Sequence, residues 1–480
     1  MKNYRIYLMA FSFGGLLSIN NTFATNPIIM DQFTADPTAR VFEGKIYLYP
    51  SHDMPGRPGD WFAMEDYHVF SSENLTDWTD HGIICDQTNV PWLNGRKNYD
   101  MWAPDCAFKN GTYYFYFPVG GRIGVATSDK PYGPWKVLDK PVTGVGGIDP
   151  CVLTDDDGSA YLFTGARGIA VSKLKDNMVE TNTRPQRITN LPQPGLIEGP
   201  FAFKRNGIYY LTYPHAVTDS AGRQGAEELE YSISTNVFGP YKWTGIITDT
   251  NESGCWTEHH SIVQYKEQWY LFYHDKQLSP NFDKNRSVRI DRLYFNGDGT
   301  IKKVIPTLRG VGIVDATSKV QIDRYSDISK AGVSASFLNT NNTFEGWKIS
   351  LKGTNTWVQF NDVDFGKTAL KKVNVRSASS TGGSIEIHLD KVDGPLLARV
   401  KIGKSPEWQV KTSAITSTRR SGVTAERRKP LDTERSGSPP KGATLLMQGS
   451  QLFNVLAGIH NLVVTHNEDN DVDLDWISFK

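Results

Sequence analysis

Several features that decide the class of a protein are scarce in this sequence. Its 480 residues contain only four cysteines, and 52 basic side chains balance 52 acidic ones. The cysteines match no metal-binding spacing, and a chain of this length can fold without disulfides. We expect either buried thiols or up to two disulfides. The neutral balance gives no electrostatic reason to expect nucleic acid as a partner.

Long apolar runs are also missing beyond the N-terminus. Lys2 and Arg5 precede an apolar run from Ile6 to Leu17, and small residues follow at the expected cleavage positions. This pattern is typical of a secretory signal peptide. No later stretch approaches the roughly 20 apolar residues that a membrane-spanning helix needs. The sequence therefore predicts a secreted or periplasmic protein without an integral membrane segment, from which residues 1–24 are removed.

Helical periodicity is nearly absent, and short runs of aromatic and β-branched residues alternate with turn residues, which is typical of an all-β protein. One unit recurs five times: a polar lead residue, often followed by proline, then a strand, a short turn and a tyrosine-rich strand. Repeats of about 40–50 residues, each forming four short strands, are typical of propeller blades. We predict a five-bladed β-propeller over residues 27–313. The five lead residues are Asp36, Asp105, Asp149, Glu198 and His260.

The repeat has a consequence for function. The innermost strands of all blades line one central axis, so equivalent positions from distant parts of the chain meet at one end of it. In a single copy, an Asp-Pro pair is explained well by turn chemistry alone. Four acidic residues among five aligned leads favour a shared site instead.

The pattern changes after the propeller. Residues 314–325 are predicted to be a linker and the start of a second domain, and the strand-like runs in 326–480 predict a β-sandwich of jelly-roll type. Residues 412–445 contain seven Lys or Arg and no aromatic residue, with many Ser, Thr, Gly and Pro. This composition predicts a disordered insertion.

Carboxyl groups that meet in one site are compatible with glycoside cleavage. Inverting hydrolysis uses one carboxylate to take a proton from water and one carboxylic acid to protonate the departing oxygen, about 6.5–9.5 Å apart. The acid must keep its proton near neutral pH, which requires burial or a nearby negative charge. The 12% aromatic content is compatible with sugar stacking, although aromatic residues also fill β-sheet cores.

Three motifs carry a family resemblance. Asp36 in ADPT, Asp149 in GGIDP and Glu198 in IEGPF resemble the acidic motifs of family-43 glycoside hydrolases, which are five-bladed propellers. The resemblance implies Asp36 as general base and Glu198 as general acid. Asp149 would raise the pKa of the acid and hold it in position. Each carboxyl taken alone is also compatible with a turn or a surface salt bridge.

The same resemblance extends to residues around the expected pocket. Arg286 in NRSV resembles the arginine that contacts substrate in the family, with Arg289 as a nearby alternative. The HHS stretch resembles the axial histidine motif, in which a histidine helps to bind a calcium ion or a water cluster in the channel. Alignment favours His259, with His260 as the alternative. The ion would have a structural role.

Two further residues are candidates from their positions alone. Trp102, just before the second repeat, is a candidate sugar platform, with core packing as the alternative. His52 is expected at the pocket rim and is a candidate for substrate binding.

The C-terminal part resembles a family-6 carbohydrate-binding module through GIHNLVVTH and DVDLDWISF. Asp475 matches the acidic residue that helps to hold a structural calcium ion there. The chain departs from the usual I-E-A-E start of that family at Ile322-Asp323-Arg324-Tyr325. Trp347 and Trp357 are candidate stacking residues, and core packing explains them equally well.

Together these features predict an inverting glycoside hydrolase acting on plant polysaccharides or oligosaccharides. The expected reaction is removal of α-L-arabinofuranosyl or β-D-xylosyl residues, with arabinofuranosyl favoured. A β-galactofuranosidase or an endo-arabinanase on the same scaffold is the alternative within the class. A non-catalytic carbohydrate-binding propeller is the alternative from another class. Apart from a possible structural Ca²⁺, no cofactor is expected.

Overall fold

The computed structural model describes residues 26–55, 61–251, 253–279, 281–341, 345, 347–367, 370–415 and 457–480. Within these ranges the long regular elements are all β-strands. The helical elements there are two single turns, η1 (Gln87–Asn89) and η2 (Pro91–Leu93). The predicted all-β class is confirmed. Among the described residues, no helix has the length and apolar character needed to cross a membrane. The predicted signal peptide lies outside the described residues.

Five antiparallel sheets follow one another along the first part of the chain, and each is built from consecutive strands. The first contains β1 (Thr34–Phe42), β2 (Lys45–His52), β3 (Asp66–Ser72) and β4 (Thr79–Asp86); the second β5 (Asp105–Lys109), β6 (Thr112–Val119), β7 (Arg122–Ser128) and β8 (Lys136–Val137); the third β9 (Ile148–Thr154), β10 (Ala160–Gly165), β11 (Ile169–Lys173) and β12 (Gln186–Arg187); the fourth β13 (Gly195–Ile197), β14 (Phe201–Arg205), β15 (Ile208–Thr218), β16 (Gln224–Ser234) and β17 (Lys242–Thr248); the fifth β18 (His260–Tyr265), β19 (Gln268–Asp275) and β20 (Ser287–Leu293).

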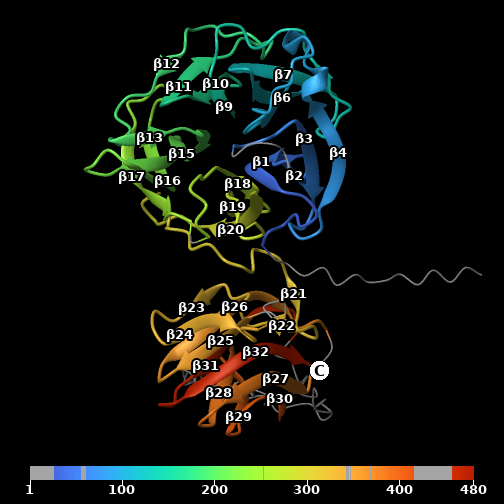
Figure 1. Cartoon of the computed structure of the whole chain (residues 1–480), viewed down its shortest axis with the longest axis vertical. Coiled ribbons are helices and arrows are strands. Elements are labelled where there is room, and N and C mark those ends of the chain that lie inside the picture. The colour runs from blue at the N-terminus through green and yellow to red at the C-terminus, as the bar shows by residue number, and fades with distance from the viewer. Residues whose placement is uncertain are drawn as a thin grey trace, which may run out of the picture.

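These sheets are arranged around a common centre (Figure 1). One strand from each sheet faces that centre, and these strands contact one another in a closed cycle, β1 with β5, β5 with β9, β9 with β14, β14 with β18, and β18 with β1. Four of the predicted lead residues lie within these strands, and Glu198 lies three residues before β14. The repeat in the sequence therefore marks equivalent positions in space.

Strand alternation explains how each sheet binds both of its neighbours. Successive side chains of a strand point to opposite faces. In β2, Leu48 packs in one buried cluster with Phe272 of the fifth sheet. The next residue, Tyr49, packs on the other side against Phe115 of the second sheet, with ring centroids 5.8 Å apart. The buried apolar surface therefore lies between neighbouring sheets. The polar lead residues lie outside these apolar clusters, within or shortly before the strands that face the common centre.

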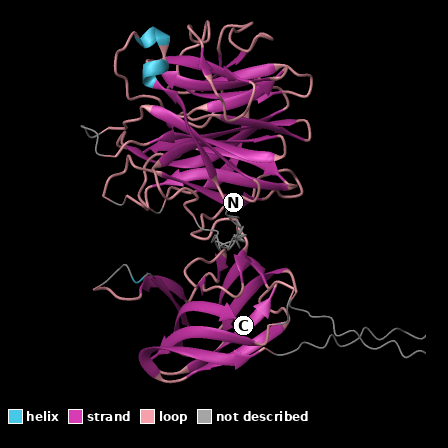
Figure 2. Ribbon diagram, turned by 90° about the vertical axis from the view of Figure 1, so that its right-hand side faces the viewer, coloured by secondary structure: helices cyan, strands magenta, loops and turns pink. Residues whose placement is uncertain are grey.

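The second part of the chain forms two six-stranded sheets around one apolar cluster (Figures 1 and 2). One sheet contains β21 (Val314–Asp315), β23 (Asp327–Ile328), β26 (Thr356–Asp364), β28 (Gly383–Leu389), β29 (Leu396–Ile402) and β31 (Ile459–His466); the other contains β22 (Val320–Gln321), β24 (Val333–Phe337), β25 (Trp347–Lys352), β27 (Lys372–Ser379), β30 (Ser405–Ala414) and β32 (Asp471–Phe479).

Two segments of this part bear on the expected boundaries. The predicted linker, residues 314–325, contains β21 and β22, which pair with β26 and β32 of the two sheets. Most of the predicted insertion, residues 412–445, lies outside the described residues, and its first three residues are the end of β30.

Arginine side chains connect the two parts. Arg309, which is 1% exposed, donates to the backbone carbonyls of Asn361 and Asp362 in β26, and Arg292 of β20 forms an ion pair with Asp362. On the other side, Arg324 donates to the carbonyl of Asn26 at 3.3 Å. A guanidinium group that donates to several carbonyls at once fixes backbone positions well, because its donors form a rigid fork.

All four cysteines are buried free thiols. Of the two expected outcomes, the structure shows the one without disulfides.

Candidate active site

The first and third leads adopt an unusual backbone conformation. Asp36 has a φ of +44° and Asp149 a φ of +52°, whereas most residues other than glycine avoid this region. After Glu198 the left-handed position falls on Gly199, with a φ of +51°. Such conformations cost about 1–3 kcal/mol each and concentrate at functional sites. The motifs thus turn the backbone sharply at, or directly after, the residue that carries each carboxyl group.

Asp36 is held by contacts from three directions. Nη1 of Arg286 donates to its Oδ1 at 2.8 Å, and Nη2 donates to Oδ2 at 3.3 Å. The hydroxyl of Ser51 donates to Oδ2 as well. The backbone N–H of Asp36 donates to Nδ1 of His274 at 3.1 Å, so this ring nitrogen is the acceptor. The carboxylate is therefore oriented through both its oxygens and its own backbone.

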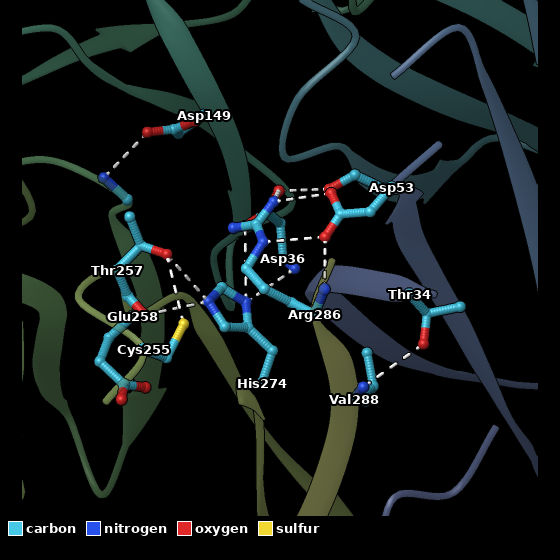
Figure 3. A network of polar contacts seen from close by, with 12 residues as sticks. Thr34, Asp36, Asp53, Asp149, Cys255, Thr257, Glu258, His274, Arg286 and Val288 are labelled. Atoms are coloured by element: carbon cyan, nitrogen blue, oxygen red, sulfur yellow. Dashed lines mark hydrogen bonds and ion pairs between the residues drawn. The ribbon is translucent and has the colours of Figure 1, made fainter. Parts of the chain in front are cut away.

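Arg286 is itself held by a second carboxylate. Asp53 is fully buried and accepts from the backbone N–H of Arg286 at 2.7 Å, from Nε at 3.0 Å and from Nη2 at 3.0 Å. The guanidinium therefore lies between two carboxylates, with Asp53 holding it and Asp36 receiving it (Figure 3). This bidentate geometry needs an arginine, because a lysine ammonium presents no planar fork.

The electrostatic surroundings keep Asp36 ionised. Burial by itself raises its pKa, but the positive charge of Arg286, the neighbouring histidines and the Ser51 hydroxyl outweigh it and lower the pKa to about 2. Burial lowers the pKa of His274 to about 3, so this ring is neutral at physiological pH. A neutral His274 with Nδ1 as acceptor carries its proton on Nε2, which lies 3.1 Å from the carbonyl of Thr257. Asp36 is thus a carboxylate that can accept a proton.

Asp149 and Glu198 form a second, close pair of carboxyl groups. Oδ2 of Asp149 accepts from the backbone N–H of Gly199 at 3.1 Å, which places it beside Glu198. Gly165 lies against both: a β-carbon there would lie 3.2 Å from Oδ2 of Asp149 and 3.3 Å from Cα of Glu198. A larger residue at 165 would push the pair apart.

This pair has the opposite electrostatic character to Asp36. Burial raises the pKa of Asp149 well above its usual value, and the neighbouring Glu198 and Asp36 raise it further. Burial and the charge of Asp36 also raise the pKa of Glu198, against a smaller lowering by Arg286. Glu198 keeps partial exposure, whereas Asp149 is buried. The site therefore combines an ionised carboxylate with a partly exposed carboxyl group that tends to keep its proton.

Glu227 is a fourth carboxyl group that the repeat does not predict. It lies in β16 and is fully buried, and its Oε2 accepts from the backbone N–H of Glu258 at 2.7 Å. Its Oε1 is buried without a partner among the described residues. Burial raises the pKa of Glu227 well above its usual value, and the charge of Glu198 adds to the effect. No motif marks this residue, because it lies within β16, away from the start of a repeat.

The second lead has a different role from the other acids. Asp105 forms an ion pair with Arg40 at 2.6 Å and accepts from the backbone N–H of Val152 at 2.5 Å. It therefore joins the first three sheets to one another, and its charge is neutralised by Arg40. The repeat alone could not distinguish this structural carboxylate from the chemical ones.

The two histidines of the HHS stretch occupy different surroundings. Burial lowers the pKa of His259 to about 4, although the negative charge of Asp36 acts in the opposite direction. Its Nδ1 would lie 2.9 Å from a β-carbon placed on Gly199. His260 is fully buried, its Nε2 lies 2.5 Å from the hydroxyl of Thr212, and its Nδ1 has no partner among the described residues. Either ring offers one nitrogen, whereas calcium prefers six to eight oxygen ligands. Bound water would have to supply most of the coordination.

Trp102 and His52 are held by local contacts. The carbonyl of Trp102 accepts from the hydroxyl of Tyr67 at 2.6 Å, while the indole Nε1 is buried without a partner among the described residues. Nδ1 of His52 lies 2.7 Å from Oδ1 of Asp66. His52, Asp66 and His68 form the one group of three in the described part of the chain whose potential metal-ligand atoms lie within 4.8 Å of one another.

In the C-terminal part, Asp475 forms an ion pair with Arg376. Asp323 is nearby, and its pKa is raised by burial, lowered by Arg324 and raised again by Asp475. A guanidinium thus already supplies positive charge where a calcium ion is expected. The expected calcium site at Asp475 stays a prediction, and an ion there would have to replace the Arg376 guanidinium as the partner of Asp475.

An ionised carboxylate bound to Arg286, beside carboxyl groups whose pKa is raised, is the arrangement that a glycosidase needs. The comparisons agree. Residues 24–301 match the model of glycosyl hydrolases family 43, and residues 329–425 match that of the carbohydrate-binding module (family 6). The first match spans more than half of the chain, which therefore belongs to glycosyl hydrolases family 43.

Individual relatives support this membership. A xylosidase/arabinosidase 43A from Humicola insolens is 35% identical over 333 residues, covering 57% of this chain and 98% of the relative. An arabinoxylan arabinofuranohydrolase from Bacillus subtilis is 28% identical, covering 82% of this chain and 86% of the relative. Among solved structures, a β-xylosidase/α-arabinofuranosidase from a compost metagenome, bound to xylotriose, is 34% identical with a TM-score of 0.52, covering 58% of this chain and 97% of that one.

Proposed function

We propose that this glycosidase removes α-L-arabinofuranosyl or β-D-xylosyl residues from plant cell-wall polysaccharides or their oligosaccharides, with inversion at the anomeric carbon. The observation that carries the proposal is the division of protonation states around Arg286. Asp36 is held ionised by the guanidinium, and Glu198 is biased toward its protonated form by burial and by Asp36. An inverting glycosidase needs both states at once.

In the proposed mechanism, Glu198 donates its proton to the glycosidic oxygen as the bond to the anomeric carbon breaks. Asp36 takes a proton from a water molecule that attacks the opposite face of the sugar. Asp149, which bonds to the backbone next to Glu198, keeps the acid in position and favours its protonated form. Arg286 holds Asp36 in position. After one cycle Asp36 carries the proton and Glu198 is ionised, and exchange with water restores both.

The choice of sugar rests on the names of relatives. The first three are a xylosidase/arabinosidase, another of the same name from Bacteroides ovatus, and a β-xylosidase from Xylanibacter ruminicola. The relatives matched over about four fifths of this chain are named arabinoxylan arabinofuranohydrolases. Because the match to these relatives extends into the second part of the chain, we favour arabinofuranosyl residues as the sugar that is removed. A β-D-galactofuranosidase from Aspergillus niger, 32% identical, keeps that activity as the alternative.

The architecture is part of the proposal. The closed cycle of strand contacts supports a five-bladed β-propeller over residues 27–313. The two sheets around one apolar core support a jelly-roll β-sandwich that binds carbohydrate. We also propose export through the signal peptide of residues 1–24. If the channel binds a calcium ion, His259 or His260 would hold it together with water.

A panel of nitrophenyl α-L-arabinofuranoside, β-D-xyloside and β-D-galactofuranoside, with arabinan and arabinoxylan, tests the proposal. We expect release of arabinose or xylose by the wild type, and loss of that release in Glu198→Gln. The exposed Glu180, which pairs with Lys175 at 2.6 Å, supplies the control Glu180→Gln, which should remain fully active. Unchanged hydrolysis by Glu198→Gln would remove it as the acid. No hydrolysis by the wild type, together with binding of arabinoxylan, would favour the non-catalytic carbohydrate-binding propeller.

A further inference from the structure

Three aromatic side chains form a continuous surface beside the catalytic arginine. Trp61 and Phe62 have ring centroids 5.3 Å apart, Trp61 and Trp256 6.4 Å, and Phe62 and Trp256 6.0 Å. Trp61 is 60% exposed, while Phe62 and Trp256 are half-buried. We call these three residues the aromatic shelf.

The shelf is joined directly to the site. The guanidinium carbon of Arg286 lies 4.6 Å from the centre of the Phe62 ring, and the same guanidinium binds Asp36. The contacts therefore run from the exposed indole of Trp61 to Phe62, from Phe62 to Arg286, and from Arg286 to the proposed general base.

The chain segments that carry the shelf also carry site residues. Trp61 and Phe62 lie between β2 and β3, the connection that begins with Asp53. Trp256 lies between β17 and β18, three residues before His259. The position of the shelf is thus set by the same backbone as the pocket, and it extends the site outward from Arg286.

An exposed indole in contact with two further rings needs an explanation, since burying such a side chain would stabilise the fold. Aromatic faces bind the apolar C–H faces of sugars, and tryptophan is suited to a half-wet position. A second cation, Lys284, lies 5.9 Å from the Phe62 ring and is paired with Asp283 at 2.6 Å. Arg286 is already paired with two carboxylates. These paired charges favour a neutral sugar over an acidic one.

We infer that the aromatic shelf binds the neutral xylosyl chain that bears the sugar being removed. This inference rests on the proposed function, whose catalytic residues it does not change. It makes Trp61 a residue that decides between polymeric and small substrates. The enzyme would act on a terminal or branching sugar held in the pocket while the remaining chain lies across Trp61 and Trp256.

The test compares Trp61→Ala, Trp61→Phe and the wild type on two substrates. One is an arabinoxylo-oligosaccharide, and the other is a nitrophenyl glycoside of the same sugar. For the nitrophenyl glycoside the variants are compared by kcat, because its aromatic leaving group can itself bind to the shelf and change KM. Competitive inhibition by the free monosaccharide product measures the pocket alone. Tyr294→Ala is the matched control. Tyr294 is 49% exposed and follows the end of β20 that is opposite to Arg286, about 23 Å along the strand.

For Trp61→Ala we expect kcat/KM on the oligosaccharide to fall about tenfold, as when one stacking partner is removed from a flat ligand. The kcat on the nitrophenyl glycoside and inhibition by the monosaccharide should stay unchanged. Trp61→Phe should recover most of the loss, and Tyr294→Ala should show none.

Three results would overturn the inference. The first is an unchanged kcat/KM on the oligosaccharide. The second is an equal loss on both substrates, which would place Trp61 in the catalytic machinery. The third is a wild type that is dimeric by light scattering and becomes monomeric in Trp61→Ala, which would make the shelf an interface between copies. A wild type that cleaves neither substrate would contradict the proposed function itself.

Discussion

Nη1 of Arg286 lies 2.8 Å from Oδ1 of Asp36, although 250 positions of sequence separate the two residues. The contact joins the last strand of the fifth sheet to the first strand of the first sheet. Because those sheets are neighbours only when the set of five closes into a ring, the electrostatic state of Asp36 depends on the completed fold.

Arg286→Lys tests how far the forked contact sets the state of Asp36. Lysine keeps the charge but cannot bind Asp36 and Asp53 bidentately at once. We expect kcat/KM to fall about ten- to hundredfold, the range for a lost hydrogen bond between charged groups. The pKa of Asp36, about 2 in the wild type, should rise, so that the acidic limb of the pH profile of kcat/KM moves to higher pH. An unchanged limb would mean that Arg286 does not control Asp36.

Asp149→Asn tests the coupling within the second carboxyl pair. The acid must be protonated to act, so activity is lost as the pH rises through the pKa of Glu198. Burial and the charge of Asp36 raise that pKa in the wild type, and the charge of Glu198 in turn raises the pKa of Asp149, because two neighbouring carboxylates repel each other. Removing the Asp149 charge should lower the pKa of Glu198 and move the basic limb of the kcat/KM profile to lower pH. A limb that stays in place, or moves to higher pH, would contradict the assigned role of Asp149.

Asp105→Ala separates the structural lead from the chemical ones. It leaves the guanidinium of Arg40 largely buried without its partner, which we expect to lower the free energy of unfolding by about 3–5 kcal/mol. The pH profile of the folded enzyme should keep its shape. The control is Asp176→Ala, because Asp176 is 98% exposed and pairs with Lys109 at 3.0 Å. Urea unfolding should show the loss only in the Asp105 variant, and a changed pH profile there would return Asp105 to the site.

Glu227 allows a test of a buried carboxyl that keeps its proton. Glu227→Gln preserves an oxygen acceptor for the N–H of Glu258 and should leave kcat unchanged, since burial raises the pKa of the native group and so favours its neutral form. Glu227→Ala leaves that N–H unpaired and should lower stability by about 1–3 kcal/mol, measured by thermal unfolding. A large loss of kcat in Glu227→Gln with an unchanged Tm would instead show that its ionised form takes part in the reaction.

The repeat in the sequence predicted where five equivalent strands begin, because each begins after a turn that proline and acidic residues favour. It also brought Asp36, Asp149 and Glu198 together as candidates. It could not predict that Asp105 is neutralised by Arg40, since the partner of a charge depends on side-chain direction between blades. Arg286 was expected to contact substrate, and its bond to Asp36 emerges only in the closed ring.

Other site residues carry no local signal at all. His274 lies next to the last residue of β19 and Glu227 near the start of β16, and neither belongs to a motif or a repeated position. The pair Trp61-Phe62 resembles any aromatic dipeptide in a loop, and its exposure is visible only once the neighbouring sheets are in place.

The anomeric configuration of the first-formed sugar tests the central claim most directly. Proton NMR during the first turnovers of an arabinofuranoside or xyloside substrate distinguishes the two anomers before they equilibrate. If Asp36 activates water while Glu198 protonates the leaving oxygen, the released sugar has the inverted configuration. A released sugar with the retained configuration would show that a carboxylate attacks the substrate directly, and would contradict the account.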